Sequence, residues 1–289
     1  MPSPADNDQP TPPPSAAAGI VYSGTGDFYI AEAIRSAQSS LRHNKLPHVI
    51  FSSTDIDGEE GLTVTRFEPS GNPYRDKIAN MRRSPFERTI YLDSDTFVVD
   101  EIGHVMGLLD RYDMAVAFAP GYRGLEDPEV PKAFYEFNTG VLAWRSSERM
   151  DAFLRDWEET YLTWLEDEAF PGSRKASRGR RADQPAFRHC AWKHDIHVFA
   201  LGQEYNFRLG FPATAVGKVR VIHGDHEDHE QLARQLNATE TARFWPPPPA
   251  LSLGGKVLRR LRRAAGRGPQ AKETPRTAPL PEVRPVDGA

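Results

Sequence analysis

The sequence predicts an α/β fold in which helices flank a mainly parallel central sheet. The chain opens with an apolar strand over residues 19–23, an amphipathic helix with apolar positions from Ile30 to Leu41, and a second strand over residues 48–53. A β-α-β unit of this kind joins two parallel strands of one sheet. The alternation of short apolar runs with helical patterns then continues along the chain, which is typical of a layered α/β structure.

The later elements follow from helical spacing of apolar residues and from short β-prone runs. The clearest is a helix over about 147–166, where Phe153, Trp157 and Tyr161 share one face with other large apolar residues. Such a stripe indicates core packing rather than a binding surface. The other predicted elements are a helix at 76–83 with Lys77 in its first turn, a strand at 90–92, a helix at 102–109, a strand at 114–118, a loop at 121–136, a strand at 137–144, a loop at 171–181, and strands at 196–201 and 219–222.

Proline marks the ends of the predicted folded part. Of the 25 prolines, six lie in residues 1–14, four at 246–249 and five from residue 269 onward. We therefore predict a disordered N-terminal tail over 1–18 and one folded domain over 19–245, which is long enough to bury a substantial core. Residues 246–289 are predicted to form a Pro-rich linker, a basic amphipathic segment and a disordered tail.

Cysteine usage and the absence of apolar segments favour a cytoplasmic protein. The single cysteine, Cys190, excludes an internal disulfide and fits a reducing compartment. Residues 1–8 have neither the basic nor the apolar region of a secretory signal peptide. No apolar run is long enough to span a bilayer.

The formal net charge of −4 is unevenly distributed. Residues 250–272 contain seven basic residues and no acidic one, so the remainder of the chain is acidic. An acidic body argues against a general nucleic-acid binder, whose basic surface should lie on the fold itself. Within the basic segment at 251–267, Val257, Leu258 and Leu261 share one helical face. This segment is interpreted either as a peripheral contact with an anionic membrane surface or as a solvated tail.

The most informative motif is a pair of carboxylates at the end of a strand. Residues 90–92 form a short apolar run that ends abruptly in Asp93 and Asp95. Side chains spaced i,i+2 on an extended chain lie on the same side, so both carboxylates can face one point beyond the strand end. In open α/β sheets, ligands bind at that edge. Oxygen ligands there suit Mg²⁺ or Mn²⁺ shared with a substrate phosphate, whereas the structural alternative is a turn that caps the next helix.

Three further patterns have both a functional and a purely structural interpretation. Gly24–Gly26 follows the first strand and precedes a helix, where it could hold a nucleotide or simply form a tight turn, since no Walker A or G-x-G-x-x-G motif is present. The five cations of the 171–181 loop form either a lid over an anionic substrate or a solvated run. His223, His226 and His229 lack the H-E-x-x-H pattern, which disfavours a dedicated zinc site.

Several short motifs also occur in one order along the chain: Asp93-Ser94-Asp95 after a strand, Asn138-Thr139-Gly140 in a strand, Asp183-Gln184 at a helix start, Glu204-Tyr205-Asn206 after a strand, and a late His223-Gly224. From about Ile20 to His226 the chain thereby resembles nucleotide-diphospho-sugar glycosyltransferases of the GT-A fold. The resemblance is to the retaining type, such as glycogenin and the bacterial lipopolysaccharide galactosyltransferases. It implies a Rossmann-like fold with a central, mainly parallel sheet.

The resemblance also implies roles for individual residues. Asp93, Asp95 and His223 would hold Mn²⁺ or Mg²⁺, and the two aspartates would also meet the ribose. Lys77, Asp183 and Gln184 would act at the transferred sugar, with Lys77 on the sugar or its phosphate. The other residues that this resemblance assigns to nucleotide-sugar binding are Tyr22, Ser23, Gly24, Thr25, Ser94, Asn138, Thr139, Gly140 and Asn206.

The chain departs from the resembled family at one motif. The family often has H-x-x-G-x-x-K-P-W near its end, with the lysine on the diphosphate, whereas residues 223–228 here are His-Gly-Asp-His-Glu-Asp and contain no lysine. Either another cation contacts the diphosphate in place of this lysine, or the diphosphate is held more weakly. Arg208, Arg220 and the cations at 174–181 are the candidates.

On this basis we expect a metal-dependent glycosyltransferase that uses a nucleotide-diphosphate sugar, with UDP as the expected nucleotide. The sequence does not identify the acceptor, which is a glycan, a lipid-linked molecule or a small molecule. A bound metal would stabilise the charge that develops on the departing diphosphate. By analogy the reaction retains anomeric configuration, and we prefer a front-face route assisted by the departing phosphate over covalent attack by Asp183.

Three alternatives use the same features. The one from another class is a non-catalytic nucleotide-sugar-binding or scaffold protein on the same fold, which the missing lysine would favour. A phosphatase of the haloacid dehalogenase type is disfavoured because Phe97 stands where that family has Thr or Val. A sugar nucleotidyltransferase is disfavoured because the Arg and Pro-Lys that follow its opening glycines are absent.

Overall fold

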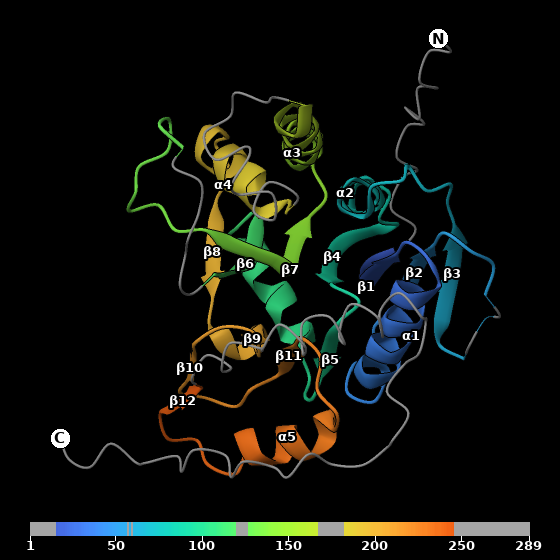
Figure 1. Cartoon of the computed structure of the whole chain (residues 1–289), viewed down its shortest axis with the longest axis vertical. Coiled ribbons are helices and arrows are strands. Elements are labelled where there is room, and N and C mark those ends of the chain that lie inside the picture. Colours follow the sequence, from blue (N-terminus) through green and yellow to red (C-terminus); the bar gives the residue numbers. More distant parts are fainter. Residues whose placement is uncertain (1–15, 57, 59, 120–126, 167–181, 246–289) are drawn as a thin grey trace, which may run out of the picture.

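The computed structural model describes residues 16–56, 58, 60–119, 127–166 and 182–245 of the 289-residue chain (Figure 1). The predicted tail up to residue 15, the cationic loop at 171–181 and the basic segment at 251–267 lie outside these residues. Seven strands form the central sheet, in the spatial order β3 (Leu62–Arg66), β2 (His48–Ser52), β1 (Ala16–Gly24), β4 (Phe86–Leu92), β7 (Phe137–Arg145), β6 (Met114–Phe118) and β8 (Val198–Leu201).

The sheet is mostly parallel, with one strand reversed. Strands β3, β2, β1 and β4 run parallel to one another, β7 runs antiparallel to both β4 and β6, and β8 is parallel to β6. The chain builds outward from β1 to β2 and β3, and then returns to place β4 on the other side of β1. The carboxyl ends of β1 and β4 therefore flank a topological switch point, where α/β proteins bind ligands.

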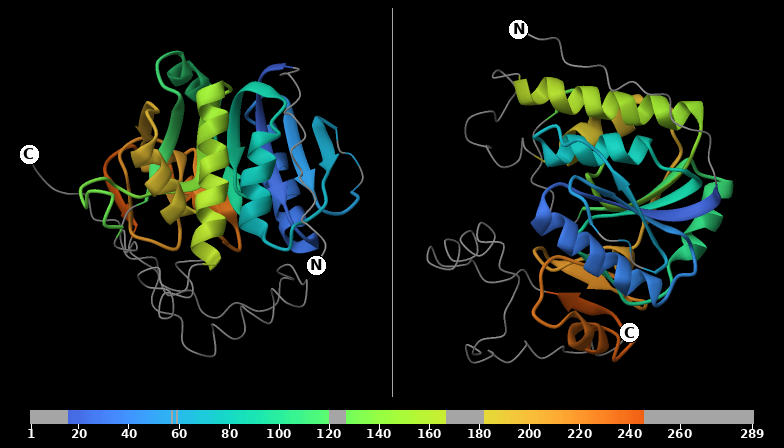
Figure 2. Two further views of the ribbon diagram at one scale, coloured as in Figure 1. Left: turned by 90° about the horizontal axis from the view of Figure 1, so that it is seen from above. Right: turned by 90° about the vertical axis from the view of Figure 1, so that its right-hand side faces the viewer.

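Helices cover both faces of the central sheet, as predicted for an α/β structure (Figure 2). On one face, α2 (Pro73–Arg82), α3 (Glu148–Glu166) and α4 (Gln184–Lys193) enclose an aromatic-rich core. On the other face, α1 (Asp27–Leu41) and the 3₁₀ helix η1 (Gly103–Asp110) enclose a second, mainly aliphatic core. This architecture is compatible with a Rossmann-like fold. None of the helices described is both long and apolar enough to cross a membrane.

Short strands form two further sheets on the α1 side of the central sheet (Figures 1 and 2). One contains β5 (Thr96–Val98), β11 (Val221–His223) and β9 (Phe207–Arg208), in that order. The other pairs β10 (Ala213–Ala215) with β12 (Arg243–Trp245). The 3₁₀ turn η2 (Gln203–Tyr205) leads into β9, and α5 (His229–Leu236) packs beneath a third small core. The sheet of β5, β11 and β9 places the end of β11 next to the end of β4.

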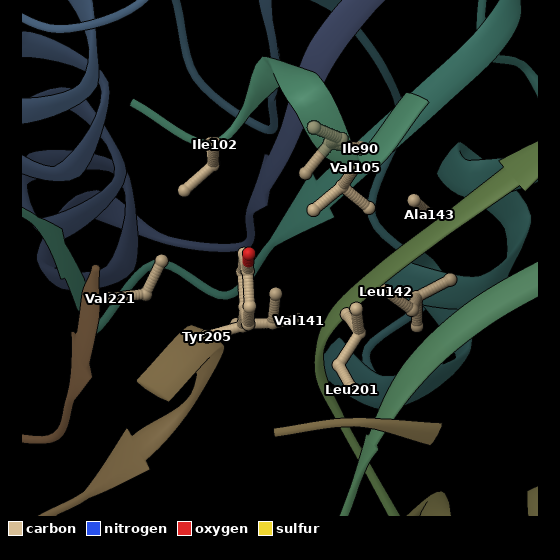
Figure 3. Close-up of a pocket in the computed structure, with 9 residues that line it drawn as sticks. All are labelled: Ile90, Ile102, Val105, Val141, Leu142, Ala143, Leu201, Tyr205 and Val221. Carbon is tan, nitrogen blue, oxygen red and sulfur yellow. The ribbon is translucent and has the colours of Figure 1, made fainter. Parts of the chain in front are cut away.

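A small cavity lies in the aliphatic core between the central sheet and η1 (Figure 3). Tyr205 is the one lining residue with a polar side chain, and its hydroxyl already pairs with His104 Nε2 at 2.6 Å. Because a ligand site needs several converging polar groups, we assign this cavity to core packing. The residues that line it are Ile90, Ile102, Val105, Val141, Leu142, Ala143, Leu201, Tyr205 and Val221.

Several element ends differ from the sequence predictions. Strand β1 begins at Ala16, so residues 16–18 extend the sheet beside β4 instead of belonging to a disordered tail. Helix α2 begins at Pro73 rather than at residue 76, because the Asn72 side chain accepts hydrogen bonds from two backbone N–H groups of the first turn. Helix α1 has Gly26 at its N-cap, with φ of 85°, and no side chain caps this helix.

Candidate metal centre

Three predicted metal ligands come together beyond the end of β4. Asp93 and Asp95 lie in the turn that joins β4 to β5, and His223 is the last residue of β11. Their ligand atoms all lie within 4.8 Å of one another. His223 Nε2 is 3.1 Å from Asp95 Oδ1 and 3.9 Å from Asp93 Oδ2. The structure therefore contains a candidate metal-binding triad.

Backbone pairing determines the approach of the histidine to the two aspartates. His223 is the antiparallel register partner of Thr96, the residue immediately after Asp95. The Gly224 N–H donates to the Asp95 carbonyl at 2.9 Å, and the Thr96 N–H and hydroxyl both donate to the Asp93 carbonyl. The aspartates therefore close a turn between two strands and cap no helix, which removes the capping alternative.

Gly140 leaves the space into which the triad converges. A Cβ at this position would lie 2.3 Å from His223 Cε1 and 2.8 Å from Asp93 Oδ2. The Gly140 carbonyl also accepts a hydrogen bond of 2.8 Å from the Asp93 N–H, which ties β7 to the turn. A side chain at residue 140 would fill the space between the ligands, so the glycine is required by close approach.

A chain of amide hydrogen bonds determines which nitrogen of His223 carries its proton. The Gly140 N–H can only donate, so the Asn138 atom that it meets at 3.2 Å is the carbonyl oxygen, Oδ1. Asn206 Nδ2 donates to that same oxygen at 2.6 Å, which turns Asn206 Oδ1 toward His223 Nδ1 at 2.8 Å. His223 Nδ1 must therefore be the donor, and in a neutral imidazole Nε2 keeps its lone pair facing the aspartates.

This donor set fits a divalent cation. Two carboxylates and an imidazole lone pair repel one another at these distances unless a metal ion or a proton lies among them. When a proton instead of a metal ion occupies His223 Nε2, the charge and hydrogen bond of His223 outweigh the effect of burial and hold the pKa of Asp95 well below its usual range. An imidazole that donates its other N–H to a carbonyl is the usual arrangement for a metal-bound histidine. Carboxylate and imidazole ligands suit Mg²⁺, Mn²⁺ and related divalent ions.

A buried ion-pair network adjoins the triad on the α2 side. Lys77 Nζ lies 2.9 Å from Asp93 Oδ1 and 3.2 Å from Asp183 Oδ2, and donates to Thr139 Oγ1 at 3.1 Å. Burial alone would lower the pKa of Lys77, yet Asp183 and Asp93 raise it above its usual value. Thr139 Oγ1 donates to Asp183 Oδ2 at 2.8 Å. Lys77 is therefore charged and held in place between an aspartate of the triad and Asp183.

Most other predicted site residues lie at the same edge of the sheet. Asn138 Nδ2 donates to Gln184 Oε1 at 3.4 Å, which links β7 to the start of α4. At the end of β1, Ser23 Oγ accepts from Asn80 and Thr25 Oγ1 donates to Asp76, both on α2. Gly24 and Ser94 are buried beside these groups.

Tyr22 does not belong to this group, contrary to its assignment from the resemblance. Its side chain is fully buried in the aliphatic core on the α1 face, where its ring stacks on His48 with centroids 6.3 Å apart. Successive side chains of a strand point to opposite faces, so Tyr22 and Ser23 cannot both border one ligand. We therefore remove Tyr22 from the candidate site and retain Ser23.

Two residues near the site were not predicted from the sequence. Tyr74 lies one helical turn before Lys77 on α2, and burial together with Asp183 raises its pKa to about 12. Glu136 precedes β7, and burial raises its pKa to about 7 against the opposing effect of Arg208. The i,i+3 spacing from Lys77 is a sequence signal for Tyr74. Glu136 has no comparable signal, because its burial depends on the packing of distant segments.

Comparison with models of protein families finds no match to this chain, and comparison with curated protein sequences also finds none. The functional interpretation therefore rests on the residues and geometry described above.

Proposed function

We propose that this protein is a metal-dependent glycosyltransferase of the GT-A fold that acts on a nucleotide-diphosphate sugar, with UDP as the expected nucleotide. One observation supports this most strongly. The metal-ligand triad and the Lys77–Asp183 network lie together at the switch point of a mostly parallel sheet. This is where an α/β protein binds a nucleotide, and a divalent ion there is commonly shared with phosphates.

In the proposed chemistry, the divalent ion and the Lys77 ammonium have different roles. A divalent ion held by Asp93, Asp95 and His223 would offset negative charge on the nucleoside diphosphate as the bond to the sugar breaks. Lys77 presents a fixed ammonium beside the metal position without needing to reorganise. Because a preorganised charge loses little free energy to reorganisation, this placement favours a charged transition state.

Asp183 fits a positioning role better than that of a covalent nucleophile. Its carboxylate is buried, with one oxygen shared between the Thr139 hydroxyl and Lys77. A carboxylate with these partners is a weak nucleophile, since attack would remove the charge that holds Lys77. This supports the front-face route, in which the departing phosphate assists the acceptor.

Calorimetric titration of UDP in the presence of Mn²⁺, and separately in EDTA, tests the proposal. We expect metal-dependent binding by the wild type and its loss in Asp95→Ala. Asp110→Asn is the matched control, because Asp110 is an exposed aspartate paired with Arg88 at the start of β4, at the opposite edge of the sheet. Absence of binding of UDP, GDP and CDP with Mn²⁺ present would contradict the proposal.

A second measurement separates catalysis from binding alone. A transferase should hydrolyse its own donor slowly when no acceptor is present, whereas a binding protein should not. A panel of UDP-sugars is therefore incubated with Mn²⁺, and released UDP is measured. Hydrolysis of one donor, lost in Asp95→Ala, would support the transferase. Tight binding without turnover of any nucleotide sugar would instead favour the non-catalytic binding protein.

A further inference from the structure

Arg208 projects toward the metal centre from the small sheet. It lies on β9, where it is the parallel register partner of His223 on β11. Side chains at paired positions of neighbouring strands point to the same face of a sheet. The guanidinium of Arg208 therefore lies on the face from which His223 reaches the two aspartates.

The charge of Arg208 lacks a direct partner in the described part of the chain. Glu136, Asp93 and Asp95 all act on it electrostatically, but none forms an ion pair with it among the contacts found there. Burial lowers the pKa of Arg208, and these three acids offset the effect only in part. A half-buried guanidinium that faces several carboxylates without pairing with any is available to bind an anion.

Phe211 holds the guanidinium in position. The Arg208 guanidinium carbon lies 3.8 Å from the centroid of the Phe211 ring, and the Phe211 N–H donates to the Arg208 carbonyl at 3.3 Å. A ring stacked on the planar face leaves the N–H groups at the edge of the guanidinium free. This edge has the forked geometry that matches a phosphate.

The other arginine considered from the sequence is already paired. Arg220 Nη1 lies 2.6 Å from Asp100 Oδ2 and 2.9 Å from the Glu101 carbonyl oxygen. The charge of Lys77 is likewise matched, by Asp93 and Asp183. A divalent ion would be balanced by Asp93 and Asp95. Of the three cations Arg208, Arg220 and Lys77, Arg208 is thus the one whose charge has no direct partner among the described residues, and it can face the charge of a diphosphate.

We propose that Arg208 binds the diphosphate of the ligand, from the small sheet and across the metal position from Lys77. This inference rests on the proposed function, because it assumes a diphosphate ligand at the triad. It assigns to β9 a role that the resembled enzymes give to a lysine after the late histidine. Phe211 would preorganise the guanidinium, and Glu136 would offset its charge while the site holds no ligand.

Binding measurements on matched arginine variants test this role. Arg208→Gln, Arg208→Lys and the control Arg220→Gln are titrated with UDP and with inorganic pyrophosphate in the presence of Mn²⁺, and Mn²⁺ affinity is measured by electron paramagnetic resonance. We expect Arg208→Gln to lose about 10- to 100-fold in affinity for both anions, the range for a hydrogen bond to a charged group. Its Mn²⁺ affinity and that of Arg220→Gln should match the wild type, and Arg208→Lys should lose less than Arg208→Gln.

The outcomes separate this inference from the proposed function. UDP and pyrophosphate binding by Arg208→Gln at wild-type affinity would overturn the role of Arg208 and leave the proposed function intact. A parallel loss of Mn²⁺ affinity would assign Arg208 to the packing of the triad and also overturn it. Failure of the wild type to bind either anion with Mn²⁺ would overturn the proposed function, and this inference with it.

A second variant keeps the test informative if Arg208→Gln is too unstable to measure. Phe211→Leu keeps the charge of Arg208 and removes only the stacked ring, whose side chain lies partly in solvent. We expect it to weaken UDP and pyrophosphate binding by about 2- to 5-fold, the value of a cation–π contact at a partly exposed site. Unchanged affinity for both anions would argue against a preorganised Arg208.

Discussion

Asn206 holds His223 in the tautomer that a metal ion requires. Its Oδ1 accepts the Nδ1 proton of His223 at 2.8 Å, and its Nδ2 donates to Asn138 Oδ1 at 2.6 Å. Asn206 is buried, so water cannot readily replace it in either bond. The orientation of a metal ligand on β11 thus depends on an amide in the segment before β9 and on another in β7.

Replacement of Asn206 should weaken metal binding without removing a ligand. In Asn206→Ala the Nδ1 proton loses its acceptor, and His223 is free to rotate or to exchange tautomers. Loss of such a supporting hydrogen bond typically lowers metal affinity about 10- to 100-fold. Mn²⁺ titration by electron paramagnetic resonance measures the effect, and circular dichroism checks that the variant is folded. Mn²⁺ affinity equal to the wild type in a folded variant would show that Asn206 does not orient the ligand.

A methyl group at residue 140 should close the metal site while the fold persists. The added Cβ of Gly140→Ala would fall 2.3 Å from His223 Cε1, so the imidazole must move away from the aspartates. Such overpacking costs about 1–3 kcal/mol, equivalent to about 5- to 150-fold in Mn²⁺ affinity. Gly107→Ala is the matched control, because nothing lies within 4 Å of a Cβ at that position of η1. Equal Mn²⁺ affinity of the two variants would contradict the close approach described for Gly140.

The part of the site that follows from local pattern could be predicted from the sequence. A strand that ends in Asp93 and Asp95 places both carboxylates at the ligand-binding edge, because side chains alternate along an extended chain. The same alternation could have excluded Tyr22, since it and Ser23 are consecutive in β1 and must point to opposite faces. The α/β class likewise followed from the opening β-α-β unit, which the structure confirms.

The remainder depends on pairings that no local pattern indicates. Strand β11 contains three residues and pairs with β5, more than 100 positions earlier in the chain. Strand β9 contains two residues, and its register with β11 is what places Arg208, and not Arg220, beside the triad. Segments this short have too few residues to show a hydrophobic period. Their pairing is set by tertiary packing, so the choice between the two arginines required the structure.

Lys77 should stabilise the fold only together with its acidic partners. Lys77→Met leaves buried carboxylates without a counterion, and we expect a loss of about 3–5 kcal/mol in the free energy of unfolding. Addition of Asp183→Asn should recover at least about 1 kcal/mol, because it removes one unpaired charge. Urea unfolding at neutral pH measures both changes. The half-exposed pair of Arg75 with Glu158 is the control, with an expected coupling below about 1 kcal/mol. Additive effects of the Lys77 and Asp183 substitutions would contradict the network.

Glu136 should make stability fall as pH rises toward neutrality. Burial raises its pKa from 4.5 to about 7, with Arg208 and Arg188 opposing the shift. Between these values the native state binds a proton that the unfolded state has lost. The contribution of Glu136 is therefore fully present below about pH 4.5 and is lost as pH rises through about 7, with an upper limit of about 3 kcal/mol.

Substitution of Glu136 by glutamine removes this proton dependence and isolates it from the other carboxylates. We expect the unfolding free energy of Glu136→Gln to rise relative to the wild type between pH 5 and pH 8, as followed by urea unfolding. Glu129→Gln should instead keep a constant difference from the wild type between pH 5 and pH 8. The hydrogen bond and ion pair with Lys193 lower the pKa of Glu129, so its contribution is lost only as pH falls below about 4.5. A difference between Glu136→Gln and the wild type that stayed constant from pH 5 to pH 8 would show that Glu136 ionises alike in both states. The charge facing Arg208 in the ligand-free site would then be that of an ordinary glutamate, already ionised at pH 5.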